Sequence, residues 1–196
     1  MTASWTSSSR RRSGTTCSAL VWAPFESRPR VEGFAALKDH ASRTGAWLAW
    51  RERAIDTVRE SVVAAGRVAR PPVNPWDIHA DGSPLVRMLL LEGDVDTAWQ
   101  EAAALGCSES VWRELARRRE IEHPEDAIPI HQREVEALLR TTGNDGYAAA
   151  VERLGHVRDL MDRVGSSDEF PGYLAAVRAA HARKRNFTKL LDAARW

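Results

Sequence analysis

The stretch that decides the fold includes SESVWRELARR at residues 108–118 and GYAAAVERL at residues 146–154. In both segments apolar residues recur three and four positions apart, as Trp112, Leu115 and Ala116 and as Tyr147, Ala150, Val151 and Leu154. This spacing places the apolar side chains on one side of an α-helix. The two leading aromatic residues stand 35 positions apart in the sequence, which is the spacing expected of a two-helix repeat.

The same spacing recurs along the chain and predicts nine helices. Residues 1–30 are rich in Ser, Thr and Arg and are expected to be disordered, whereas residues 31–65 are expected to form one helical hairpin. Residues 66–83 contain several Pro and predict a loop, and residues 84–196 are expected to form a helical-repeat region.

Capping residues support these helix limits. Ser83, Asp94 and Ser108 each precede an apolar helical pattern and are expected to be N-cap residues, and Pro124 is expected to open another helix. Short connections between successive helices favour antiparallel hairpins. No segment alternates as a half-buried strand does. The sequence therefore predicts an all-α protein, an array of antiparallel helical hairpins of the tetratricopeptide-like or α-solenoid kind.

Large aromatic side chains are expected to form much of the core. They lie on the apolar sides of the expected helices, where a packed interface takes up a large ring. The structural core residues that we predict are Trp47, Trp99, Trp112, Tyr147, Phe170 and Tyr173.

Composition narrows the class of protein. Of the 196 residues, 43% are hydrophobic and 28% are charged, as in soluble globular proteins. Only Cys17 and Cys107 carry thiols, which favours a reduced, cytoplasmic protein. No apolar run approaches the roughly 20 residues of a membrane-spanning helix, so no membrane association is expected.

Two partial resemblances to known proteins follow from the motifs. The Trp112, Leu115 and Ala116 pattern resembles a tetratricopeptide-type repeat, although Arg119 stands where such repeats have an aromatic residue. Three further segments, taken in order, resemble the C-terminal helical region of bacterial SWIM zinc-finger family proteins. They are FESRP leading to GAW and RERA (residues 25–54), HPEDA leading to HQ (residues 123–132), and FPGY leading to HARKRNF (residues 170–187). The chain lacks the family's Cys-x-Cys and Cys-x-His zinc motif, so its metal ligation and its usual nucleic-acid role do not carry over.

No catalytic, cofactor-binding or metal-binding residues are predicted. The six histidines are too far apart in sequence for a paired zinc motif, and His131 and His181 lie on apolar stripes, where hydrogen-bonded core or interface positions are expected. Cys107 precedes an expected N-cap, and a small, half-buried position is favoured over a reactive thiol. Neither a Gly-x-Ser-x-Gly elbow nor a Gly-rich phosphate loop occurs.

The C-terminal segment is the most basic part of the expected helical region. Between Arg178 and Trp196 it has six basic side chains and one acidic side chain, while residues 31–196 together have 23 basic and 26 acidic ones. The candidate nucleic-acid contacts are Arg183, Lys184, Arg185 and Lys189. Since the expected helical region is mildly acidic overall, the favoured function is a non-enzymatic module that binds a protein partner. A nucleic-acid-associated accessory module that binds weakly through this basic helix is the alternative.

Overall fold

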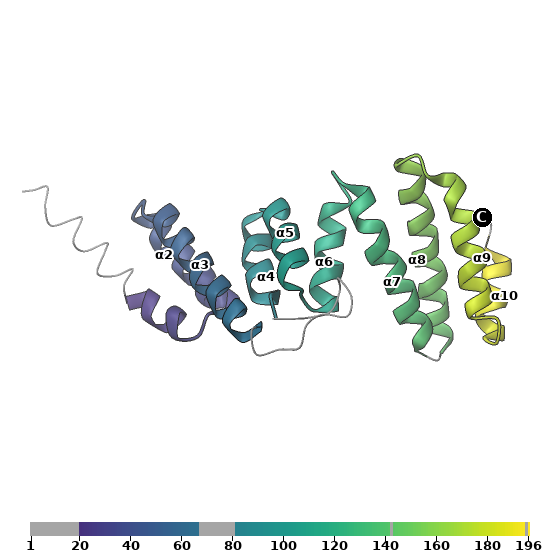
Figure 1. Ribbon diagram of the computed structural model, residues 1–196, viewed down its shortest axis with the longest axis horizontal. Helices are drawn as coiled ribbons and strands as arrows, with labels where there is room; N and C mark the ends of the chain where they lie inside the picture. Colours follow the sequence, from purple (N-terminus) through teal and green to yellow (C-terminus); the bar gives the residue numbers. More distant parts are fainter. Residues whose placement is uncertain (1–19, 67–80, 142, 195) are drawn as a thin grey trace, which may run out of the picture. The chain divides into compact units, whose positions relative to one another are not determined.

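The computed structural model describes residues 20–66, 81–141, 143–194 and 196, and within them the chain is helical with no strand. The prediction of an all-α protein is confirmed. The chain divides into two compact units, Met1–Val111 and Trp112–Trp196. Figure 1 shows the helices of each unit in chain order.

The first unit contains two helical hairpins. Helices α2 (Val31–Arg43) and α3 (Trp47–Gly66) form one, and α4 (Ser83–Glu92) and α5 (Val95–Leu105) form the other. Helix α6 (Glu109–Arg119) crosses the division between the units. Leu37, Val58 and Met88 are among the buried residues that each helix contributes to this core.

Order in the first unit begins before Val31. Residues 20–27 are helical, and Trp22 and Phe25 are buried against later aromatic rings. The centroid of the Trp22 ring lies 5.3 Å from that of Trp50, and the Arg53 guanidinium lies 4.2 Å from the Trp22 centroid. The disorder expected of residues 1–30 is therefore wrong for the segment from residue 20 onward, because its aromatic side chains are covered. Residues 1–19 lie outside the described residues, as do residues 67–80 of the expected Pro-rich loop.

The second unit is built from the end of α6 and four further α-helices. These are α7 (Pro124–Arg140), α8 (Asn144–Arg163), α9 (Phe170–Ala180) and α10 (Arg185–Ala193), with the short 3-10 turn η1 (Ser167–Glu169) before α9. One core cluster joins α7, α8, α9 and α10 through Val135, Leu139, Ala150, Leu154, Val177, Phe187 and Leu191. A second cluster contains Val157, Met161 and Phe170.

The predicted core aromatics differ in how far they are covered. Trp112 and Phe170 are buried, with relative exposures of 1% and 4%. The other four, Trp47, Trp99, Tyr147 and Tyr173, are partly buried. Tyr147 and Tyr173 pack against the first core cluster of the second unit.

Of the residues predicted to be N-caps, Asp94 is one in the structure and Ser83 is not. Asp94 is the N-cap of α5, where its side chain accepts a hydrogen bond from the Thr97 backbone N–H at 3.2 Å. Ser83, by contrast, lies inside α4, whose N-cap is Gly82. The Ser83 Oγ instead accepts a hydrogen bond at 2.9 Å from the backbone N–H of Ser108. This contact ties the start of α4 to the segment that follows α5.

Two glycines allow the α4–α5 hairpin to close at both ends. Gly93 ends α4 with φ +78°, a left-handed conformation that glycine adopts without a Cβ clash. At the other end the Gly82 N–H donates to the Gly106 carbonyl at 3.1 Å. A Cβ atom on Gly82 would lie 2.5 Å from that carbonyl oxygen, so the two backbones approach too closely for any larger residue.

We predict that Gly82→Ala destabilises the protein, by more than about 1 kcal/mol, because the backbone must move to relieve the clash. The matched control is Gly155→Ala in the interior of α8, where a Cβ atom meets nothing within 4 Å. Since Ala favours a helix interior over Gly, this change should stabilise by roughly 0.5–1 kcal/mol. Urea unfolding of both variants measures the two effects, and equal midpoints would contradict the close approach.

Candidate functional site

Two clusters of buried or half-buried charged side chains stand out, one in each unit. The first surrounds Glu92 in the first unit, and we call it the Glu92 cluster; it consists of Lys38, Trp47, Arg51, Glu92 and Asp94. The second surrounds Glu120 in the second unit, and we call it the Glu120 cluster; it consists of Glu120, His131 and His156.

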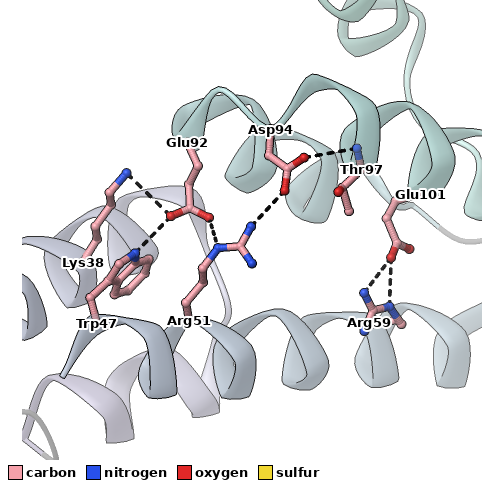
Figure 2. Close-up of polar contacts among 8 residues, drawn as sticks. All are labelled: Lys38, Trp47, Arg51, Arg59, Glu92, Asp94, Thr97 and Glu101. Atoms are coloured by element: carbon pink, nitrogen blue, oxygen red, sulfur yellow. Dashed lines mark hydrogen bonds and ion pairs between the residues drawn. The ribbon is translucent and has the colours of Figure 1, made fainter.

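The Glu92 cluster joins the two hairpins of the first unit (Figure 2). The Glu92 side chain is only 8% exposed and accepts hydrogen bonds from Trp47 Nε1 at 3.1 Å and from Arg51 Nε. Lys38 Nζ lies 3.6 Å from the same carboxylate, and Arg51 also reaches Asp94 at 3.0 Å. Burial would lower the pKa of the Arg51 guanidinium, but hydrogen bonds and charge attraction from Glu92 and Asp94 outweigh it and raise the pKa. These contacts serve hairpin packing.

A second ion pair fastens the same two hairpins farther along α3. The Arg59 guanidinium donates from Nε at 3.0 Å and from Nη2 at 2.6 Å to Glu101 Oε1 on α5. Figure 2 shows this pair to one side of the Glu92 cluster, along the same face of α3. Two points of attachment along one helix fix its register against the neighbouring hairpin.

The Glu120 cluster combines three elements of the second unit. Glu120 follows the end of α6, His131 lies in α7 and His156 lies in α8. His131 Nε2 and His156 Nε2 lie 2.8 Å and 2.9 Å from the same oxygen, Glu120 Oε2. The two imidazole rings meet edge to face with their centroids 4.8 Å apart. Two imidazole nitrogens and one carboxylate oxygen from three parts of the chain therefore lie close together.

A second carboxylate lies behind His131. Glu134 Oε2, one helical turn farther along α7, lies 3.5 Å from His131 Nδ1. Arg153 Nε from α8 lies 3.1 Å from the same Glu134 oxygen, and Arg113 pairs with the other oxygen at 4.0 Å. The Glu134 side chain is only 9% exposed, so its charge is compensated inside the helix packing.

Both carboxylates of this region are held ionised. Burial would raise the pKa of Glu120, but hydrogen bonds from His156 and His131 outweigh it and lower the pKa. The hydrogen bond from His131 lowers the pKa of Glu134 against the effect of burial, and the charges of Arg153, His131 and Arg113 lower it further. The interior of the second unit thus keeps two negative charges under nearly neutral conditions.

The histidines and the cysteine singled out in the sequence have defined surroundings. His131 is fully buried and bonded to Glu120, and His181 Nε2 lies 2.9 Å from Glu136 Oε2 with its side chain 14% exposed. Cys107 is buried. His123 pairs with Glu125 at 3.4 Å, whereas Asp126 pairs with Arg119 at 2.9 Å.

The candidate nucleic-acid contacts lie in and before α10. Arg183, Arg185 and Lys189 are exposed, and Lys184 Nζ lies 5.6 Å from the centroid of the Tyr147 ring. Phe187, which a nucleic-acid reading would use for base stacking, is 1% exposed and belongs to the core cluster. The structure therefore leaves this segment with charge for phosphates and without a stacking ring.

Sequence reasoning did not find the Glu120 cluster. A paired zinc motif in the sequence has histidines at short helical spacing, whereas His131 and His156 stand on different helices and meet only through the packing of α7 on α8. Glu120 directly follows Arg117, Arg118 and Arg119, and in the sequence it has the appearance of one member of a mixed-charge run. A useful signal is that His131 lies on the apolar side of its helix, where a polar ring requires a partner from another element.

Comparison with protein-family models, curated proteins and solved structures finds no match to this chain. The relation to SWIM zinc-finger proteins accordingly stays a prediction. Among the described residues, no helix combines the length and apolar character needed to cross a bilayer.

We predict that Glu134→Gln makes unfolding less sensitive to acid. The folded-state pKa of Glu134 lies below its ordinary value of 4.5, so the stability that this group contributes is complete above that value and is lost as the pH falls through the folded-state pKa. The variant should be less stable near neutral pH, yet its free energy of unfolding should fall less steeply between about pH 5 and 3. Urea unfolding across this range measures the slope, with exposed Glu152→Gln as control. An unchanged slope for Glu134→Gln would contradict the linkage.

Proposed function

We propose that the protein is a non-enzymatic helical-repeat module that binds a protein partner through the outer side of α9. The observation that carries this proposal is the make-up of that surface. Seven residues of α9 are exposed, and apart from Arg178 they are Pro171, Gly172, Ala175, Ala176, Ala179 and Ala180. The only charged group of this face, Arg178, is paired with Asp192 of α10.

The neighbouring helix α8 has a different exposed surface. Apart from Ala148, its exposed residues are all polar or charged, namely Asn144, Asp145, Glu152, Asp159, Asp162 and Arg163. Repeat proteins usually carry such polar residues on the outer faces of their terminal helices, where only water is met. The small side chains of α9 instead permit close approach of another helix, which makes α9 the better docking surface.

The way in which the hairpins are joined also supports a repeat module. In the first unit ion pairs and hydrogen bonds run from α3 to the α4–α5 hairpin, and in the second unit they run from α7 to α8. In the first unit the α2–α3 hairpin thus presents a face that the α4–α5 hairpin covers, and in the second unit the ion pair joins two successive helices. A tetratricopeptide-like arrangement of these hairpins and a cytoplasmic location belong to the same proposal.

We predict that Ala176→Glu combined with Ala179→Glu abolishes partner binding without unfolding the protein. Both positions are exposed in a helix, so Glu is tolerated there, whereas two buried charges in an interface would be strongly unfavourable. The matched control is Ala148→Glu, which adds a charge to the polar exposed surface of α8. The measurement is capture from the source cell followed by titration of the captured protein. Equal affinity for the double variant and the control would reject α9 as the docking surface.

An alternative function rests on the exposed basic side chains of the C-terminal segment. Arg183, Arg185 and Lys189 are available to phosphates, and a nucleic-acid-associated accessory module would use them together with Lys184. Burial of Phe187 removes the ring beside these basic residues that would stack on a base, so their contribution to binding rests on charge. Charge-only binding is weak, indifferent to sequence and sensitive to salt.

We predict that replacing Arg183, Lys184, Arg185 and Lys189 with Gln abolishes weak oligonucleotide binding and leaves partner capture unchanged. Each lost phosphate contact should reduce the slope of log affinity against log salt concentration by about 0.7–0.9. Oligonucleotide titrations across a salt series measure this for both proteins, and circular dichroism checks that helicity is retained. Tight, sequence-selective binding that persists at physiological salt would promote the nucleic-acid function over the protein-binding one.

A further inference from the structure

The Glu120 cluster has the composition of a site for a transition-metal ion. Imidazole nitrogen and carboxylate oxygen are the donors that zinc takes from proteins besides thiolate, and three protein ligands with an open fourth position form a common arrangement. The ligand atoms of Glu120, His131 and His156 all lie within 4.8 Å of one another. They come from three separate elements, so the folded packing of α7 and α8 assembles the set.

The distances require the side chains to move. Ligand atoms about 2.0–2.1 Å from a tetrahedral zinc ion lie about 3.3–3.4 Å from each other. The two His–Glu distances of 2.8 Å and 2.9 Å would therefore open by about half an ångström. All ligand atoms lie within 4.8 Å of one another, so the two imidazole nitrogens would approach by up to about 1.4 Å, through rotation of the half-exposed His156 and of the Glu120 side chain.

The hydrogen bonding of the cluster gathers its donor atoms around one point. Both imidazoles contact the same oxygen, Glu120 Oε2, whose two lone pairs can accept both N–H groups. A cation placed between the three side chains would be attracted to the two imidazole nitrogens and to the carboxylate oxygen. Arg163 donates to the carbonyl oxygens of Glu120 and Ile121 at 2.9 Å and 3.3 Å, so it fixes the backbone of this ligand.

An independent feature is the carboxylate behind His131. A metal-bound imidazole commonly donates its other N–H to a carboxylate, which fixes the ring and its tautomer. Glu134 Oε2 lies 3.5 Å from His131 Nδ1 and is itself paired with Arg153. Arg153 Nη1 lies 3.5 Å from the same Nδ1, so this nitrogen can accept from Arg153 or donate to Glu134 according to its tautomer. Ligation through Nε2 would select the tautomer that donates to Glu134.

Burial of the cluster is graded from the interior to solvent. The His131 side chain is fully buried, that of Glu120 is 18% exposed and that of His156 is 35% exposed. The buried side supplies a fixed ligand and a low dielectric, and the side of His156 gives an ion and a water ligand a route of entry. We propose that Glu120, His131 Nε2 and His156 Nε2 bind one divalent zinc ion, with water as a fourth ligand and Glu134 as the residue that orients His131.

The test uses the full chain without a histidine tag, stripped with a chelator and dialysed against Zn²⁺ alone. The wild-type protein should retain about one zinc ion per chain, and its melting temperature should rise with zinc concentration. His156→Gln removes a half-exposed ligand, so it should fold and should weaken zinc binding by about ten-fold or more. Glu134→Gln should weaken binding about ten- to a hundred-fold while leaving the stoichiometry near one.

The matched control is His181→Gln. His181 also bonds to one glutamate, at 2.9 Å from Glu136, but that site brings together a single imidazole and a single carboxylate. This variant should bind zinc as the wild type does. The proposal is overturned if the wild-type chain retains no stoichiometric zinc, or if His156→Gln and His181→Gln bind zinc with equal affinity.

Discussion

The alignment of the two hairpins of the first unit depends strongly on one buried carboxylate, that of Glu92. Ionised groups with 8% exposure are costly unless their lone pairs are filled, and Trp47, Arg51 and Lys38 fill them from the α2–α3 hairpin. Removing one partner of such a group typically costs about 3–5 kcal/mol, because the other charge remains buried. An arrangement of the two hairpins that leaves the Glu92 carboxylate unpaired is therefore unfavourable in free energy. Apolar contacts alone would discriminate less between alternative arrangements.

The second unit uses the same principle with different partners. Glu134 receives Arg153 from the neighbouring helix, and Glu120 receives two imidazoles from α7 and α8. The difference lies in the donors: guanidinium groups stay charged under all relevant conditions, whereas an imidazole exists in several protonation and tautomeric states. The Glu92 cluster of the first unit therefore takes its charge from guanidinium and ammonium groups, and the Glu120 cluster of the second unit takes its donors from imidazoles.

Local sequence predicted the parts of this fold that local forces determine. The apolar stripes and the Asp94 cap are properties of one helix and its ends. The errors lie where a distant contact decides. Ser83 is a residue type that favours N-cap positions, but its hydroxyl accepts a hydrogen bond from the Ser108 backbone N–H. The segment at Trp22 looks polar and aperiodic until the rings of Phe25 and Trp50 cover it. Any two ligand atoms of the Glu120 cluster meet only when two separate elements have packed, and all three meet only when three have packed.

Stability alone does not account for the Glu120 cluster. Apolar residues of similar volume at the junction of α7 and α8 would pack at least as well, since buried polar groups often contribute no net stability. Fixing the register of α7 against α8 is one reason to retain polar groups, but Glu134 and Arg153 already provide that across the same pair of helices. What the Glu120 cluster adds is the convergence of two nitrogen atoms and one oxygen atom at a point that solvent can reach through His156. Register does not require three donor atoms to lie around one point, whereas ligation of an ion does.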